Sequence, residues 1–316
     1  MSRRPPTPRR GLRHRVEGTL GNLRLIFNGD DYGRAVSINS AIVRAHAQGV
    51  LTSASLMVTG DALEDAVARA REHPTLAVGL HVAVMGARGA LPPAAVPHLV
   101  NAQGLLPRNP FLAGVRFFLS PALRAELRCE IAAQFERFAD TGLPLAHVDG
   151  HYLMHLHPTI FPMLISLAEK YGAPGIRFPR DDLRLTLALN RKRLAGKVTW
   201  ASTYALLCRL AERRLAQSPL AFTDRVYGLL QTGQMHEAFV AALVRRISAN
   251  VRSAELFFHP STQPLSQPFG PNPGDLAALL SPRVRQAVSA RGAQLISYAD
   301  LAAARPGRLC PAPAPF

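Results

Sequence analysis

Short apolar runs recur along this chain, and segments with helical periodicity separate most of them. Seven runs have the composition of buried strands: 25–28, 53–58, 78–81, 146–149, 175–177, 256–259 and 294–297. Helical patterns lie at 37–49, 61–74, 122–140 and 159–171. Alternation of this kind is typical of parallel α/β folds. It predicts an irregular TIM-like (β/α) barrel of about seven strands.

Two segments interrupt this alternation. Residues 90–111 are long and proline-rich, which is typical of a loop over an active-site mouth. Residues 181–250 read as a predominantly helical insertion, too long for a simple crossover. Within it, residues 183–217 carry eight basic side chains and one acid, Glu212, interleaved with leucines and a tryptophan. Such a helix either lies on an anionic membrane or presents an arginine-rich face to water.

The two ends of the chain differ from its middle. Residues 1–15 contain six arginines, three prolines and no acid, so a disordered basic tail is expected over 1–22. One barrel domain is expected over 23–305, including the insertion, with a short tail over 306–316. No secretory signal and no apolar run of membrane-spanning length is recognised, and the three cysteines are far apart. We therefore expect a cytoplasmic protein, with peripheral contact at the inner membrane as an option.

The net charge is strongly positive, with 37 lysines and arginines against 21 acids, or +16. This balance indicates an anionic neighbour, either nucleic acid or an acidic membrane, unless it only reflects a general bias toward arginine. Neither an aromatic platform for single strands nor a recognition helix is recognised. No nucleic-acid partner is therefore expected, and a non-catalytic nucleic-acid-binding protein is kept only as an alternative that metal content would test.

Ionisable residues gather at the ends of five of the predicted strands. They are Asp30 and Asp31, then His81, then His147, Asp149, His151 and His155, then Arg177, and finally His259. In β/α barrels the catalytic groups come from the carboxyl ends of several strands. Two adjacent carboxylates repel unless a positive group lies between them. Carboxylates with several imidazoles indicate one divalent metal ion, with zinc favoured over magnesium.

Four motifs in order, "NGDDYG", "GLH", "HVDGHYLMH" and "FFHP", resemble those of the YdjC-like carbohydrate deacetylases. These are relatives of the polysaccharide deacetylases on an irregular TIM-like barrel, and the resemblance covers residues 23–300. "FNGDDYGRAVSINSAI" and the "HVDGH…LHP" block resemble most the hopanoid-biosynthesis branch of this family, HpnK.

The resemblance implies removal of an acetyl group from an N-acetylated amino sugar. By motif, Asp30 is the general base and Asp31 a metal ligand. His81 and His151 complete the metal site, and His259 protonates the leaving amine.

Further residues are expected to contact the substrate or to support the site. Tyr32 is expected to line the mouth, with Asp149 and His155 as further substrate contacts. Arg177 is expected to bind the sugar or to pair with a site carboxylate, unless it is an ordinary surface residue. His147 is an alternative to His151 as ligand, or a residue that supports the metal site.

The leading hypothesis is a metal-dependent N-deacetylase acting on an N-acetylglucosaminyl hopanoid lipid. The alternatives are a deacetylase of soluble N-acetylated chitooligosaccharides and, less favoured, a metallophosphoesterase. Such phosphoesterases generally show an early His-x-His pair, whereas the earliest here is His155-Leu156-His157.

Overall fold

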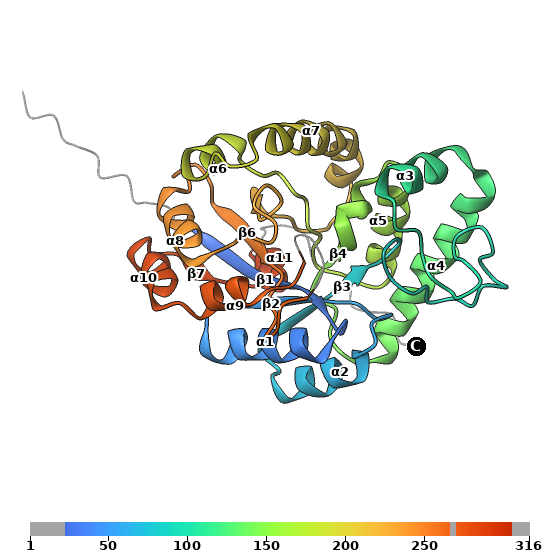
Figure 1. Ribbon diagram of the computed structural model, residues 1–316, viewed down its shortest axis with the longest axis horizontal. Coiled ribbons are helices and arrows are strands. Elements are labelled where there is room, and N and C mark those ends of the chain that lie inside the picture. The colour runs from blue at the N-terminus through green and yellow to red at the C-terminus, as the bar shows by residue number, and fades with distance from the viewer. Residues whose placement is uncertain (1–22, 266–269, 305–316) are drawn as a thin grey trace, which may run out of the picture.

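The computed structural model describes residues 23–265 and 270–304, and in them one curled parallel sheet is wrapped by helices (Figure 1). The strands are β1 (Arg24–Tyr32), β2 (Ser53–Leu56), β3 (Ala77–Val82), β4 (Val148–Gly150), β5 (Arg225–Tyr227), β6 (Ser253–Phe258) and β7 (Gln294–Leu295). Their order is β4-β3-β2-β1-β6-β5, with β7 beside the start of β1. The predicted fold class, an irregular TIM-like barrel, is confirmed.

The helices surround this sheet in four groups (Figure 1). Below it lie α1 (Val36–Gln48) and α2 (Leu63–Glu72), and to the right α3 (Pro110–Leu119), α4 (Pro121–Asp140) and α5 (Ile160–Lys170). Above it lie α6 (Leu183–Leu189) and α7 (Leu194–Ala216), and to the left α8 (Glu237–Arg246), α9 (Pro273–Leu280) and α10 (Pro282–Ala290). A 3₁₀ helix, η1 (His151–Leu156), follows β4, and α11 (Tyr298–Ala303) follows β7. No helix in the described ranges has the length and apolarity to cross a bilayer.

Single backbone bridges, not a regular ladder, span the space between β4 and β5. Val148 N donates to Gly175 O at 3.0 Å, Arg177 N donates to Val148 O at 3.0 Å, and Ile176 N donates to Ala221 O at 2.8 Å. The predicted strand at 175–177 is therefore an isolated bridge segment in the place of a strand.

The predicted helical insertion at 181–250 contains a strand of the sheet that the sequence pattern missed. Its first part forms α6 and α7, but β5 then pairs with β6 and α8 packs against α9 and α10. Only three residues long, β5 has too few positions for a periodicity to be recognised. The tails expected at 1–22 and 306–316 lie outside the described residues.

β1 is buried on both faces, which explains its continuous apolar run. Leu25 and Phe27 belong to the main core, whereas Ile26 packs with Ile296 and Tyr298 in a second cluster. Because side chains alternate along a strand, Asn28 and Asp30 continue the face of Ile26. The carboxyl end of β1 therefore delivers polar groups onto the same face of the sheet as the buried Ser55 of β2, to which Asn28 donates at 2.8 Å.

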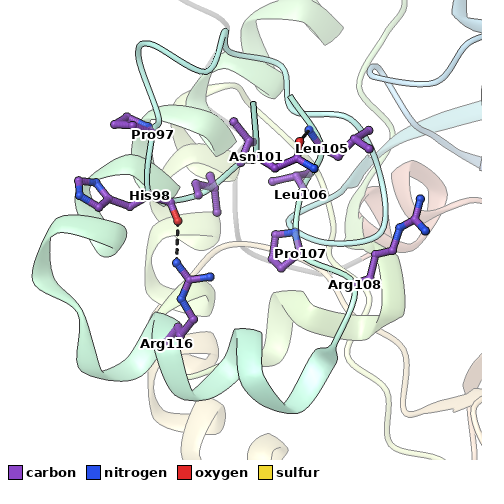
Figure 2. A pocket seen from close by; sticks show the side chains of 10 residues that line it. Pro97, His98, Asn101, Leu105, Leu106, Pro107, Arg108 and Arg116 are labelled. Carbon is purple, nitrogen blue, oxygen red and sulfur yellow. Dashed lines mark hydrogen bonds between the residues drawn. The ribbon is translucent and has the colours of Figure 1, made fainter. Parts of the chain in front are cut away.

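The proline-rich segment 90–111 belongs to the long connection between β3 and α3 and forms a pocket of its own. Figure 2 shows this pocket, with Arg116 of α3 directed at His98, whose carbonyl accepts its hydrogen bond at 2.9 Å. None of the predicted site residues lines it. A neighbouring pocket is lined by Arg108 of this segment and also by Arg34, which pairs with Asp31. The segment therefore borders the site without covering the predicted residues.

Gly79 of β3 allows His147 to pack against the sheet, so we predict that Gly79→Ala destabilises the fold. A Cβ atom here would lie 2.3 Å from the His147 ring, which is fully buried and stacked on Tyr298. The free energy of unfolding should fall by about 1–3 kcal/mol, measured by urea denaturation. Gly196→Ala in α7 is the matched control, because no atom lies within 4 Å of its Cβ position. Equal stability of the two variants would contradict the prediction.

Candidate active site

Asp30 is oriented by the guanidinium of Arg177. Arg177 donates from Nη1 to Oδ2 of Asp30 at 2.8 Å and from Nη2 to Oδ1 at 2.7 Å. Asn28, two residues earlier on β1, donates to Oδ1 as well at 2.8 Å. Bidentate pairs of this kind fix the plane of a carboxylate as well as its position. Asp30, only 2% exposed, is therefore held in one orientation at the end of β1.

Arg177 also binds two other buried carboxylates. Nη1 lies 2.8 Å from Asp149 Oδ2, and Nε donates to Glu255 Oε1 at 2.8 Å. Tyr298 donates its hydroxyl to the second oxygen of Glu255. Burial alone would lower the pKa of Arg177, but the three carboxylates hold that pKa well above its usual range. Arg177 is 0% exposed, so it pairs with site carboxylates and is neither a sugar contact nor a surface residue.

Asp31 faces a different set of groups because the backbone turns at this residue. Its φ of 66° is in the left-handed region, which aspartate tolerates better than most residues, and the register of β1 with β2 shifts here. Arg34 donates to Oδ2 at 2.9 Å, whereas Oδ1 lies 3.1 Å from His151 Nδ1. Burial would raise the pKa of Asp31, but His151 and Arg34 hold it well below its usual range.

His81 at the end of β3 is oriented by Asp149. Its Nδ1 donates to Asp149 Oδ1 at 2.7 Å, which leaves Nε2 facing Asp31 Oδ1 at 3.7 Å. Carboxylate–histidine pairs of this kind commonly orient metal-binding imidazoles. Burial lowers the pKa of His81, but Asp149, Asp30 and Asp31 outweigh it and raise the pKa to about 9. The raised pKa reflects the negative charge gathered around this imidazole, which also favours a cation there.

The Asp31, His81 and His151 side chains fit a divalent metal ion. One ligand atom from each lies within 4.8 Å of the others, and all three residues are buried. His151 Nε2 has no hydrogen-bond partner among the described residues, and the contact of Asp31 Oδ1 with His151 Nδ1 at 3.1 Å falls short of a well-formed hydrogen bond. Buried polar atoms without a partner are costly, and a metal ion removes that cost.

Formal charge supports the same conclusion. Four buried carboxylates, Asp30, Asp31, Asp149 and Glu255, bind only two guanidinium groups, those of Arg34 and Arg177. With neutral imidazoles, this leaves two negative charges (four minus two), which one divalent cation balances. Two imidazoles and one carboxylate are typical ligands of zinc and similar transition ions.

His259, one residue beyond β6, lies beside Asp30. Its Nε2 is 3.9 Å from Asp30 Oδ2, and its backbone N–H donates to Asp275 at 3.0 Å. Its side chain is 15% exposed, more than those of the proposed metal ligands, and it lines the pocket that contains them. It is therefore placed where it can meet a substrate.

Three of the predicted substrate contacts are buried and do not reach the pocket, so these predictions are corrected. Tyr32 is 0% exposed and donates its hydroxyl to Ala66 O of α2 at 2.7 Å. Asp149 is fully buried between His81, Ser55 and Arg177. The Nε2 of His155 lies 3.0 Å from the backbone carbonyl oxygen of Arg177, so this side chain stabilises the backbone at Arg177.

His147 does not belong to the metal cluster. Its ring stacks on Tyr298 with centroids 5.0 Å apart, and its Nε2 lies 3.1 Å from Ser55 Oγ. Complete burial lowers its pKa to about 4, so it is neutral. Of the two candidate ligands, only His151 lies with Asp31 and His81.

The sequence analysis did not assign several residues that the structure places at the site. Glu255 stands inside the apolar run of β6, and an acid in a buried strand is a recognisable signal. Arg34, which forms an ion pair with Asp31, lies three residues after it in the sequence. Tyr152 and Trp200, which are 51% and 45% exposed, line the mouth of the pocket. Trp200 comes from α7, so only the tertiary structure brings it to the site.

These features define a class: a curled parallel (β/α) barrel with a buried carboxylate–histidine cluster that fits a metal ion. The model of the YdjC-like protein family matches residues 24–290, and the chain belongs to this family.

Proteins similar to this chain include two relatives and one solved structure, described next. A carbohydrate deacetylase of Brevibacillus brevis is 40% identical over 157 residues, or 50% of this chain and 60% of that protein. The match thus spans less than two thirds of that relative's length. A chitooligosaccharide deacetylase of Serratia marcescens is 28% identical over 282 residues, or 88% and 98% of the two chains. A solved structure from Enterococcus faecalis, described as that of a cellobiose-phosphate cleavage protein, superposes with a TM-score of 0.69 at 23% sequence identity. The superposition covers 89% of this chain and 99% of that chain, and this likeness shows the fold.

We predict that Asp31→Asn and His151→Ala bind zinc at least about tenfold more weakly than the unaltered protein, because each removes a ligand. Metal content after dialysis and isothermal titration calorimetry would measure this. His259→Ala is the matched control, since His259 lies in the same pocket but outside the cluster. Equal zinc affinity of Asp31→Asn, His151→Ala and the control would rule out this site.

Proposed function

We propose that this protein is a metal-dependent N-deacetylase of N-acetylated amino sugars. The observation that carries the proposal is the buried cluster of Asp31, His81 and His151 beside Asp30 and His259, in one pocket. The relatives named carbohydrate deacetylase and chitooligosaccharide deacetylase support this class of reaction. The reaction consumes one water, breaks the amide C–N bond, and releases acetate and a free amine.

Asp31, His81 and His151 would hold the metal, for which we propose zinc. When bound, the ion supplies Lewis acidity that polarises the acetyl carbonyl and makes a water molecule more acidic. Asp30 accepts the proton of the attacking water, while Arg177 and Asn28 keep its carboxylate in place.

His259 donates a proton to the departing nitrogen. Its Nε2 lies 3.9 Å from Asp30, so the proton acceptor and the proton donor flank the same space in the pocket. Because the two groups come from β1 and the end of β6, which pair along Arg24–Gly29, their spacing is set by a regular ladder.

We predict that Asp30→Asn retains zinc but lowers kcat by roughly 100-fold or more, the usual size of a lost general base. Acetate release from N,N′-diacetylchitobiose would measure the rate, and metal analysis the occupancy. Asp31→Asn is the comparison variant, because it should lose both zinc and activity. The same phenotype for both variants would contradict the separate roles of the two acids.

The proposed substrate is an N-acetylglucosaminyl hopanoid lipid. The resemblance to the hopanoid branch supports it, as does the position of α7, which brings the apolar surface of Trp200 to the pocket mouth. A soluble chitooligosaccharide is the second candidate, supported by the Serratia marcescens relative. A metallophosphoesterase is not proposed, because His155 faces a backbone carbonyl and His157 packs on Phe117, both outside the metal cluster.

Contact with an anionic membrane through α7 is part of this proposal. Leu194, Val198, Trp200, Leu206 and Leu210 of α7 are exposed. Basic residues surround them, and the one acid of the helix, Glu212, pairs with Arg180. A lipid substrate would then be processed at the cytoplasmic face of the inner membrane.

We predict that acetylated glucosaminyl hopanoid in mixed micelles is deacetylated with a kcat/KM at least about tenfold higher than N,N′-diacetylchitobiose, because remote binding energy lowers the barrier. Mass spectrometry would follow the loss of one acetyl group. Metal-free protein restored with zinc serves as the control for both substrates. Equal or faster turnover of the soluble sugar would favour the oligosaccharide.

A further inference from the structure

The α3 helix presents a continuous apolar stripe to solvent. Its exposed residues are Phe111 (81%), Leu112 (56%), Val115 (40%), Phe118 (59%) and Leu119 (68%). Phe111, Val115 and Phe118 follow the spacing i, i+4 and i+7, and Leu112 and Leu119 are their neighbours in sequence. All five therefore lie on one side of the helix. Ala113 and Phe117 are buried on the other side, where Phe117 packs against His157 at a centroid distance of 6.0 Å. The helix is thus apolar on both sides, and only one side is covered.

The stripe belongs to a well-formed helix. The Asn109 side chain accepts a hydrogen bond from Leu112 N at 3.0 Å, and Pro110 occupies the first turn. Ser120 ends α3 and its side chain caps α4. Large exposed apolar patches on folded proteins usually mark interaction sites.

The charges around the stripe favour an anionic partner. Residues 101–129 contain Arg108, Arg116, Arg124 and Arg128, all exposed, against one acid, Glu126. The Glu126 side chain is 12% exposed and already pairs with His98. A symmetric contact between two copies would bring this same arginine-flanked patch against itself. An anionic bilayer, by contrast, offers an apolar interior to the stripe and phosphates to the arginines.

The buried side of α3 is linked to the mouth of the pocket through a short chain of contacts. His157, which packs on α3, follows η1, and η1 carries Tyr152 at the pocket mouth. The hydroxyl of Tyr204 in α7 donates to Tyr152 O at 3.2 Å. In Figure 1, α7 lies above the sheet and α3 lies to the right. Through η1, both helices are linked to the region where Tyr152 and Trp200 line the mouth.

We infer that the apolar stripe of α3 inserts into the interface of an anionic bilayer while its flanking arginines bind lipid phosphates. This deepens the proposed membrane contact, and only its link to a lipid-borne substrate rests on the proposed function. The surface holds the pocket mouth toward the lipid headgroups.

The test is cosedimentation of the full chain with vesicles of phosphatidylcholine, with and without phosphatidylglycerol, and without any glycolipid. Phe111→Ser combined with Phe118→Ser should weaken binding to anionic vesicles by roughly 100-fold, because burial of each ring is worth about tenfold or more. Leu295→Ser is the matched control and should bind like the unaltered protein, since Leu295 is an exposed apolar residue of β7, which pairs with the start of β1. Residues 1–22 are present in every variant, so their arginines contribute equally.

Trp200, the only tryptophan of the chain, reports on the mouth in the same experiment. Its emission should shift to shorter wavelength when anionic vesicles bind, and binding without a shift would overturn the proposed orientation. Absence of binding by the unaltered protein, or equal binding by the double variant, would overturn insertion. A dimer that the double variant dissociates, seen by sedimentation equilibrium, would assign the stripe to self-association. Acetate release from N,N′-diacetylchitobiose should be equal in all variants. This assay therefore distinguishes a failure of the proposed deacetylase activity from a failure of membrane binding.

Discussion

The ion-pair network of Arg177 is the interaction on which the rest of the site depends. A fully buried guanidinium is costly to desolvate, by several kcal/mol, unless nearly all its N–H groups find anionic partners. Here the partners are Asp30, Asp149 and Glu255, which come from β1, β4 and β6. Arg177 itself stands on the bridge segment that spans the irregular part of the barrel. One side chain therefore links the irregular part of the sheet to the regular ladder between β1 and β6, and it orients the carboxylates at the same time.

The two adjacent acids near the end of β1 avoid mutual repulsion because the backbone separates their partners. Asp30 continues the regular strand and meets Arg177, whereas Asp31 has a left-handed backbone and faces Arg34 and the histidines. The same turn gives one acid a full set of hydrogen-bond donors and leaves an oxygen of the other facing the imidazoles of His81 and His151. A buried carboxylate oxygen beside two imidazoles is suited to a metal ion, and a fully hydrogen-bonded carboxylate is suited to a fixed position beside it.

Around this centre the helices divide into those that cover the sheet and those that leave apolar surface exposed. α1 and α2 bury their apolar residues against the strands, which is the usual arrangement in a barrel. The exposed apolar residues of the described chain are concentrated instead on α3 and α7, with basic residues nearby. The exposed apolar surface of α7 reaches the pocket mouth at Trp200, which connects the proposed lipid substrate to a physical feature of the fold.

The sequence by itself determined most of the strands and the gathering of carboxylates and histidines at their ends, because buried parallel strands are continuous apolar runs and their carboxyl ends meet. The choice of Asp31, His81 and His151 as metal ligands came from the resemblance to the YdjC-like deacetylases. It missed β5, whose three residues have no readable period, and assigned substrate contacts to Tyr32 and other buried side chains. Only the tertiary structure decided which way each strand-end side chain points, because a one-residue register shift reverses its direction. It also showed that Arg177 and Glu255 form a buried pair, since their partners are distant in sequence and meet only when the sheet curls.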